Sequence, residues 1–312
     1  MSGSVLFPAG SPAAIDTPWA WWLLAGGGVL WAATCVVLVL VLRGGGRLRR
    51  SAPRSWLVGG GVLLPLAVLL PLGWATLGGD RARALPAPNE ALMVGVTGRL
   101  WWWALRIEPG DGQPAVVSAN ELVLPRGRKV RLALQSDDVI HSLWIPALAG
   151  KVDLLPGRVQ GQWLQAEQTG RFDAPCAEFC GTAHSHMRLS VLVVEEAAFA
   201  QWLVDQRRPA REPATPLQAR GRAAFAALQC IACHTVRGLA EATLRGVDGG
   251  PELTHLASRA MLGAGVLPND AAGLRRWLTA LPDIKPGARM PSYAHLDTAT
   301  LDALVAYLGS LD

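Results

Sequence analysis

Cys176-Ala-Glu-Phe-Cys180-Gly-Thr-Ala-His184-Ser-His186-Met187 is the stretch around which the chain is organised. It places two thiols, two imidazoles, a carboxylate and a thioether within one short segment. Soft sulfur together with imidazole selects copper, zinc or iron over magnesium or calcium. The stretch therefore predicts a soft-metal site.

Two uncharged segments near the N-terminus predict a transmembrane hairpin, with helices at about 19–42 and 56–77. Each is long enough to cross a bilayer core of about 30 Å, which needs about 20 residues. The loop 43–55 carries five arginines and no acid, so the positive-inside rule makes it cytoplasmic. Residues 1–18 are then an extracytoplasmic N-terminus, and a polar linker at 78–89 follows the hairpin. Two buried helices of a soluble protein are the alternative.

The overall composition agrees with a membrane anchor that carries folded domains. Mean hydropathy is +0.26, and the apolar excess lies near the N-terminus. Residues 90–206 carry 10 Lys and Arg against 13 Asp and Glu, and residues 217–312 carry 9 against 8. Neither region has the dense basic face that nucleic-acid binding requires, so no nucleic-acid partner is expected.

Short and partly alternating apolar segments predict a β-sandwich or Greek-key barrel over residues 90–206, closed by a helix near 196–205. A Pro-rich linker at 207–216 precedes an all-α domain at 217–312. The predicted strands are 92–96, 100–107, 121–124, 129–134, 161–166 and 187–194. The predicted helices of the last domain are 218–228, 271–278 and 298–311, the last with Asp297 as its N-cap.

The C-x3-C pair on a loop allows both thiolates, Cys176 and Cys180, to point into one site. His184 and Met187 lie within reach of the same centre, and His141 is the only histidine of the sandwich region outside the stretch 176–187. A disulfide between the two cysteines is one alternative, but it leaves the following His and Met unexplained. A single zinc or a mononuclear copper is another, although thiolate with Met is a poor pattern for structural zinc.

Cys230-Ile-Ala-Cys233-His234 is the C-x-x-C-H pattern of c-type haem attachment, in which both thiols form thioethers and the imidazole binds iron. Met290 is the predicted second axial ligand, because Met raises the potential of a His-ligated haem. Met261 is its competitor. A zinc or redox motif is the alternative reading, and the available Met and the length of the domain favour haem.

The hairpin, the Val139-Ile-His-Ser-Leu-Trp144 context of His141 and the stretch 176–187 together resemble cytochrome c oxidase subunit II, over residues 19–206. That resemblance implies a cupredoxin domain with a dinuclear copper centre, CuA. Its implied ligands are bridging Cys176 and Cys180, His141 with Met187 on one copper, and His184 with the Glu178 carbonyl on the other.

Two further roles are implied by the same resemblance. The Glu178 carboxylate would bind Mg²⁺ or Mn²⁺ at the interface with subunit I. Trp101, the first of three consecutive tryptophans, would be the point where electrons reach the copper domain. Side chains alternate along a strand, so the three cannot all face the core, and at least one is expected to be exposed or at an interface. A Trp-rich core is the structural alternative.

Residues 217–312 resemble a class I cytochrome c domain from end to end, and a CuA subunit fused to such a domain resembles the caa3-type oxidases. In that family Gly221, Phe225 and Tyr307 would form a helix crossing, and the Pro251 carbonyl would accept the ring N–H of His234. Many subunit II sequences carry a Glu just before the second span. Residues 50–56 contain no acid, so the resemblance does not extend to that proton route.

The implied function is electron input to a terminal oxidase in a bacterial inner membrane, with both cofactor domains on the periplasmic side. Electrons from a soluble cytochrome c or a quinol-oxidising complex would pass through haem c and CuA to subunit I, which reduces O2 to water among further oxidase subunits. The alternatives are a CuA-containing subunit of a nitric oxide reductase and a membrane-anchored electron carrier without a catalytic partner.

Overall fold

A computed structural model describes residues 4–43, 53–79, 91–110, 112–244 and 248–312. The chain forms two compact units: one comprises residues 5–7 and 14–84, and the other includes residues 8–13 and 85–312. Most of the predicted loop 43–55 and nearly all of the linker 78–89 lie outside the described residues.

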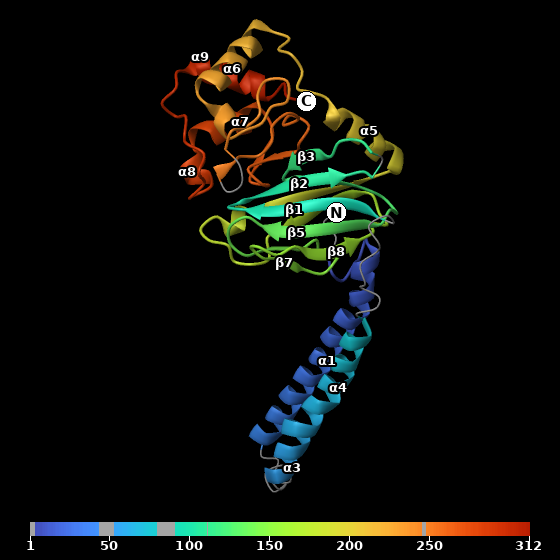
Figure 1. Ribbon diagram of the computed structural model, residues 1–312. Coiled ribbons are helices and arrows are strands. Elements are labelled where there is room, and N and C mark those ends of the chain that lie inside the picture. Colours follow the sequence, from blue (N-terminus) through green and yellow to red (C-terminus); the bar gives the residue numbers. More distant parts are fainter. Residues whose placement is uncertain (1–3, 44–52, 80–90, 111, 245–247) are drawn as a thin grey trace. The chain divides into compact units, whose positions relative to one another are not determined.

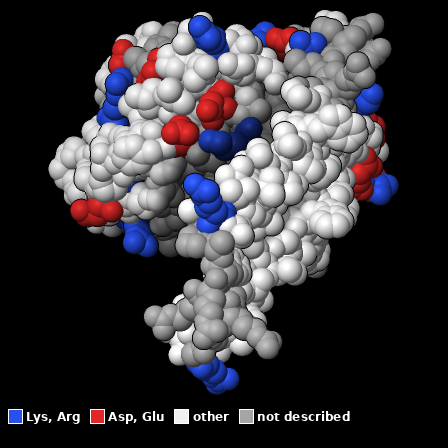
Figure 2. All heavy atoms as spheres, turned by 90° about the horizontal axis from the view of Figure 1, so that it is seen from below, with Lys and Arg blue, Asp and Glu red and all other residues white. Residues whose placement is uncertain are grey.

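The first unit is helical and apolar. Its elements are α1 (Ser11–Leu42, whose first turn belongs to the second unit), α3 (Pro53–Val58), the π-helix η1 (Gly59–Leu63) and α4 (Leu64–Gly79). Two helical stretches, Ser11–Leu42 and Arg54–Leu77, are long and apolar enough to cross a membrane. Figure 2 shows a broad surface without charged side chains on these helices. Helix α1 begins before the predicted start at 19, since Pro12 falls in its first turn, where a missing N–H is not needed.

Residues 8–13 pair with the β-rich domain rather than with the hairpin. The backbone N–H of Ala9 donates to Ala147 O at 2.7 Å, and that of Ser11 donates to Gln165 O at 3.0 Å. At Gly10 a Cβ would lie 2.9 Å from Gln165 O, so this close backbone approach needs glycine. The start of α1 is therefore fixed to the β-rich domain.

Residues 92–194 form the predicted β-sandwich. One sheet has the strand order β3-β2-β1-β5-β8 and the other has β4-β10-β9, as Figure 1 shows for the larger sheet. The strands are β1 (Leu92–Arg99), β2 (Trp102–Glu108), β3 (Val116–Ala119), β4 (Glu121–Pro125), β5 (Val130–Ser136), β6 (His141–Leu143), β7 (Val152–Leu154), β8 (Gln160–Leu164), β9 (Gly170–Pro175) and β10 (Arg188–Val194).

The sandwich is held by the inward face of each strand. Burial alternates along β1 and β10, so that side chains such as Val94, Val96, Leu189 and Val191 are almost completely buried between the sheets. Parallel pairing of β1 with β5 and of β10 with β4 gives the mixed topology. Helix α5 (Glu196–Arg207) packs Phe199 into the same core.

The C-terminal domain is helical, as predicted, and has a core of its own. Its elements are α6 (Pro216–Ala227), η4 (Cys230–Ala232), β11 (Met261–Leu262), β12 (Leu267–Pro268), α7 (Ala271–Thr279), α8 (Leu281–Ile284) and α9 (Thr298–Leu308). Helices α6 and α9 cross at Gly221, where a Cβ would lie only 2.0 Å from Ala303 O. Phe225 and Tyr307 meet edge to face beside it, with ring centroids 5.7 Å apart. The predicted helix crossing is confirmed.

The Pro-rich linker between α5 and α6 is bonded to the helical domain along its length. The Ala210 N–H donates to Arg237 O at 2.8 Å, and the Arg237 guanidinium donates to Arg208 O at 3.0 Å. Buried His255 bonds the same carbonyl through Nε2. His255 is thus a packing residue, and no metal-binding motif surrounds it in the sequence.

Candidate functional site

The loop between β9 and β10 carries the two buried thiols. The Sγ atoms of Cys176 and Cys180 lie 3.9 Å apart, which is too long for a disulfide and short enough for both to bind one centre. The Cys176 N–H donates to Met187 O at 2.9 Å and closes the loop at its base. Antiparallel β9 and β10 thereby fix both ends of the ligand stretch.

His141, at the start of β6, is brought to the thiols by pairing across the loop. Leu143 bridges to Cys176, and the Ala177 N–H donates to Ser142 O at 3.0 Å. His141 Nδ1 lies 3.9 Å from Cys176 Sγ, and one ligand atom each of His141, Cys176 and Cys180 all lie within 4.8 Å of one another. The side chain of His141 is completely buried.

Asp138 sets the orientation of His141. Its Oδ1 lies 2.8 Å from His141 Nε2, which leaves Nδ1 facing the thiols. A carboxylate on the far ring nitrogen is the usual support of a metal-binding histidine, since it fixes ring orientation and raises ligand basicity. The sequence patterns alone do not single out Asp138, although an Asp three residues before a candidate histidine ligand is the signal that could have identified it.

The remaining predicted ligands surround the same pair of thiols. His184, on the short helix η3 (His184–His186), places Nδ1 3.5 Å from Cys180 Sγ. Met187 Sδ lies 3.9 Å from Cys180 Sγ, and the Glu178 carbonyl oxygen lies 3.3 Å from Cys176 Sγ. All six predicted donors are therefore brought together. No contact joins His186 to this group, and its buried Nδ1 has no partner in the described part of the chain.

The thiols are electrostatically prepared for a cation. The hydrogen bond from Cys180, assisted by His141, lowers the pKa of Cys176 to about 3. The same bond, together with burial, raises the pKa of Cys180. Burial lowers the pKa of His141, but the hydrogen bonds and negative charges of Asp138 and Cys176 together outweigh it, and the net shift of the pKa is upward. A thiolate with polarised imidazoles and a thioether suits a soft metal such as copper.

The side chain of Glu178 is 42% exposed. Its Oε2 accepts from Lys151 Nζ at 3.4 Å, at the surface. Among the described residues no second group of three metal-binding side chains surrounds it. A hard cation there would need further ligands from another chain or from water.

Trp101 connects the metal site to the helical domain. Its Nε1–H donates to Cys180 O at 2.8 Å, and its ring is 8% exposed. Trp103 is fully buried in the sandwich, whereas Trp102 is half-buried beneath the Arg99 guanidinium, 4.9 Å from the ring centroid. The expectation that the three tryptophans do not share one environment is confirmed, and Trp101 lies at a domain interface.

The C-x-x-C-H segment forms a second site, with Cys230 and Cys233 present as free thiols on and beside η4. His234 Nδ1 donates to Pro251 O at 2.7 Å, as predicted, which leaves Nε2 for a metal. Burial lowers the pKa of His234 and so favours the neutral imidazole, the form that binds metals. At Gly250 a Cβ would lie 2.5 Å from His234 Cε1, so glycine leaves room for the ring.

Space for a prosthetic group adjoins this segment. A cavity of about 270 Å³ is lined by Cys233 and Gly250 on one side and by Arg99 and Trp102 on the other. Met290 is half-buried and packs against the same core as Cys230. The thiols, the oriented His234 and this cavity fit a covalently attached haem.

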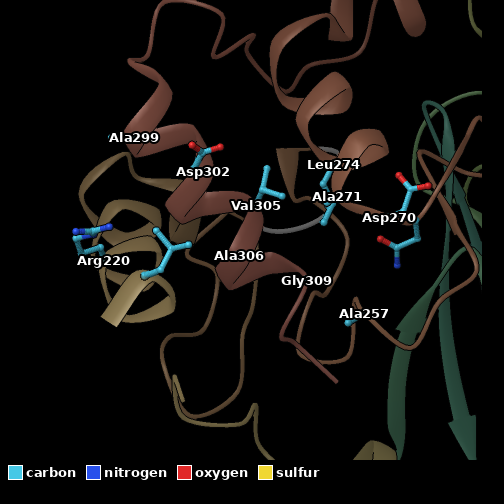
Figure 3. A pocket seen from close by; sticks show the side chains of 12 residues that line it. Arg220, Ala257, Asp270, Ala271, Leu274, Ala299, Asp302, Val305, Ala306 and Gly309 are labelled. Carbon is cyan, nitrogen blue, oxygen red and sulfur yellow. The ribbon is translucent and has the colours of Figure 1, made fainter. Parts of the chain in front are cut away.

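A larger cavity, of about 630 Å³, lies between α6, α7 and α9 (Figure 3). Its lining includes Arg220, Asp270 and Asp302 but no cysteine, histidine or methionine. It offers no ligand for iron or copper. Of these two cavities, only the smaller one has a residue of the C-x-x-C-H segment, Cys233, in its lining.

Comparison with known proteins gives the same division of the chain. Residues 106–195 match the family described as cytochrome C oxidase subunit II, periplasmic domain, and residues 218–312 match cytochrome c. Cytochrome c oxidase subunit 2 of Alkalihalophilus pseudofirmus is 32% identical over 254 residues, covering 80% of this chain and 71% of that protein. The protein of the same name from a Bacillus species is 32% identical, covering 72% and 63%.

Among solved structures, the periplasmic domain of subunit II of cytochrome oxidase from Bradyrhizobium japonicum is 31% identical to this chain. The similarity covers 39% of this chain and 97% of the Bradyrhizobium domain, with a TM-score of 0.36. The two separate family matches imply copper for the β-rich domain and haem for the helical domain.

Proposed function

Because the chain belongs to the cytochrome c oxidase subunit 2 family and carries a fused cytochrome c domain, we propose that it is the electron-input subunit of a caa3-type oxidase. Relatives in this family are subunits of haem-copper oxidases, so subunit I is a partner and the two apolar helices are a membrane anchor. The observation that carries the proposal is that four further donors surround two thiols whose Sγ atoms lie 3.9 Å apart.

Two copper ions account for this donor set better than one. A single tetrahedral ion uses four ligands, whereas the cluster offers three side chains (His141, His184 and Met187) and the backbone carbonyl of Glu178 in addition to two thiols. Cys176 and Cys180 would bridge the pair, His141 with Met187 would complete one copper, and His184 with the carbonyl of Glu178 would complete the other. Neither a zinc site nor a disulfide gives a use to every donor.

When bound, the copper pair and the haem supply one-electron chemistry, by which electrons from a donor reach subunit I and reduce O2 to water. The residues of this chain hold and insulate these groups. Asp138 fixes the tautomer and direction of His141, and the closed β9–β10 loop excludes water from the thiols. Trp101, bonded to Cys180 O, is the proposed contact through which the copper domain receives electrons.

In the helical domain, Cys230 and Cys233 would attach the haem covalently, with His234 and Met290 as axial ligands. The Pro251 carbonyl orients His234 by accepting its Nδ1–H. Glu178 would contribute its carboxylate to a Mg²⁺ or Mn²⁺ ion shared with subunit I, which agrees with its exposed position and the shortage of other ligands around it.

The cofactor domains are proposed to lie on the periplasmic side of a bacterial inner membrane. Residues 9–13, at the start of the first span, bond to the copper domain, which agrees with an N-terminus on the same side. The electron donor would be a soluble cytochrome c or a quinol-oxidising complex. A nitric oxide reductase subunit would share this electron-input architecture and is the second candidate.

The copper assignment is tested by Cys176→Ser, with Cys35→Ser as the matched control because Cys35 lies within α1. We expect Cys176→Ser to abolish the mixed-valence copper EPR signal and to leave the c-type haem absorbance, while Cys35→Ser keeps both. A copper signal that survives in Cys176→Ser would contradict the bridging role.

An activity assay on the purified complex distinguishes O2 from NO as the terminal electron acceptor. Purified with its catalytic subunit, the complex should consume O2 with reduced cytochrome c as donor, and consumption of NO without O2 would favour the reductase. Recovery of the chain with both cofactors but never with a haem-copper subunit would favour a membrane-anchored carrier. For the haem, Met290→Ala should change the low-spin spectrum and Met261→Ala should not; the reverse would assign Met261 as the axial ligand.

A further inference from the structure

The helical domain contacts the copper domain at Trp101 through a short loop. Lys285 Nζ donates to Trp101 O at 2.6 Å, and Gly287 lies so close to the indole that a Cβ there would be 2.8 Å from Cη2. This loop continues directly into Met290, the proposed haem ligand. The other end of the indole donates to Cys180 O. Trp101 is thus contacted from both proposed cofactor sites.

Lys285 also joins Trp101 to a second docking element. Its Nζ donates to Gly263 O at 2.7 Å, in the turn between β11 and β12. In that turn, Ala264 O accepts from the backbone N–H of Arg188, the residue after Met187, at 3.0 Å. The Lys285 amino group is therefore hydrogen-bonded both to the backbone of Trp101 and to the β11–β12 turn. That turn also accepts a hydrogen bond from Arg188, at the end of the ligand stretch.

The burial of Lys285 marks it as more than a surface contact. The side chain is 3% exposed, and no carboxylate contacts it among the described residues. Burial lowers the pKa of Lys285 to about 7, offset in part by the nearby Cys180. Placing an ionisable group in such a site is unfavourable unless its hydrogen bonds are satisfied, and both acceptors here are backbone carbonyls of the two domains.

We propose that Lys285 is a positioning residue that holds the haem domain against Trp101, so that the loop bearing Met290 stays next to the indole bonded to Cys180. Gly287 is the second part of this contact, because any side chain at its position would displace the indole. The inference rests on the proposed function and adds to it the interface through which the two domains of one chain exchange electrons.

The consequence is that electron transfer between the domains depends on residues that bind neither cofactor. Loss of the Lys285 bonds would leave haem and copper intact but reduce the fraction of molecules with the haem domain in contact with Trp101. We expect the rate of haem oxidation through the copper site to fall about tenfold, equivalent to about 1.4 kcal/mol.

The test uses the whole purified complex. Lys285→Met removes the amino group and keeps an apolar stem, and Lys129→Met, at an exposed lysine of the copper domain, is its control. The fully reduced complex is mixed with O2 in a stopped-flow instrument, and oxidation of the c-type haem and of the haem in subunit I is followed separately. Lys285→Met should slow the first by about tenfold and leave the second unchanged, with normal copper EPR and haem spectra.

Gly287→Ala tests the same contact by a different change and remains informative if Lys285→Met folds poorly. Gly287 has φ +83°, so Gly110→Ala, at φ +79° with open space around it, controls for the backbone cost of alanine. Gly287→Ala should slow haem oxidation and Gly110→Ala should not. Wild-type rates in both Lys285→Met and Gly287→Ala would overturn the inference.

Failure of the proposed function would give a different result. If haem oxidation in the Cys176→Ser complex, which lacks the bridging thiolate, were as fast as in the wild type, electrons would not pass through the copper site at all. The positioning role is tested only by the Lys285 and Gly287 variants in a complex whose wild type transfers electrons by that route.

Discussion

Gly98→Ala should disable the copper site without altering a ligand. Gly98 lies on the inward face of β1, and a Cβ there would be 2.6 Å from His141 Cδ2 and 2.9 Å from Cγ. Non-bonded carbons rest about 3.5–4.0 Å apart, so the imidazole would have to move by about 1 Å. The ring is completely buried and held through Nε2 by Asp138, which leaves it no free direction in which to move.

A displacement of this size is large for a metal ligand. Metal–ligand distances tolerate only about ±0.2 Å, and disturbing the support of a ligating histidine typically costs about 10–100-fold in metal affinity. We expect copper affinity to fall at least tenfold and the EPR spectrum to change. The measurement is a copper titration of the apo chain against a competing chelator, followed by EPR of the loaded protein.

Gly95→Ala is the matched control, because it introduces the same methyl group in the same strand. A Cβ at Gly95 would meet Arg106 Cβ and O at 3.7 Å, an ordinary contact distance. It should bind copper as the wild type does. The reasoning would be refuted if Gly98→Ala kept wild-type affinity and spectrum, or if Gly95→Ala lost copper to the same extent and so implicated the strand instead of the ring.

Three further predictions concern the haem domain. Gly250→Ala would place a methyl group 2.5 Å from His234 Cε1, and it should alter the haem spectrum while copper EPR stays unchanged; an unaltered spectrum would contradict this. Thr215→Ala removes a capping box at α6 and should lower the free energy of unfolding by about 1 kcal/mol, measured by denaturant unfolding at the haem absorbance. The pKa of Asp297 is lowered, chiefly because its carboxylate accepts a hydrogen bond from the Thr300 N–H. The stabilisation that the Asp297 cap gives to α9 is therefore complete above about pH 4, and it is lost as the pH falls through the folded-state pKa. Asp297→Asn should therefore flatten the acid dependence of stability, and an unchanged acid unfolding curve would count against it.

Local patterns predicted most of the secondary structure. Alternation identified β1, β5 and β10, and the period of the last helix identified α9 with Asp297 as its cap. The strands β3, β6, β7 and β9 were not predicted, because three to six residues carry too little periodicity. They are strands because partners select them: β9, for example, pairs Phe172 with Val191 of β10.

The candidate ligands could be predicted because most of them lie close together in the sequence. Five of the predicted donors lie within the stretch 176–187, and chemistry at close spacing is visible in a sequence. The supports of the site are not. Gly98 of β1 meets His141 of β6, and Lys285 reaches Trp101 from 184 residues away. Such contacts form only in the folded chain, and a glycine or a lysine in the sequence does not by itself indicate a functional role.

Fusion of the two domains would allow the contact at Trp101 to serve as the proposed electron-transfer interface. Two separate proteins must offset an association cost of about 4–15 kcal/mol before an interface is stable. A linker of about ten residues, itself bonded to Arg237, removes most of that cost by holding the partners at high effective concentration. Strong charge attraction is then unnecessary, in agreement with the nearly balanced charge of residues 217–312. The contacts at Trp101 therefore need not supply binding energy and can instead fix the orientation of one domain against the other. The buried Lys285, which donates to one backbone carbonyl of each domain, is suited to that purpose.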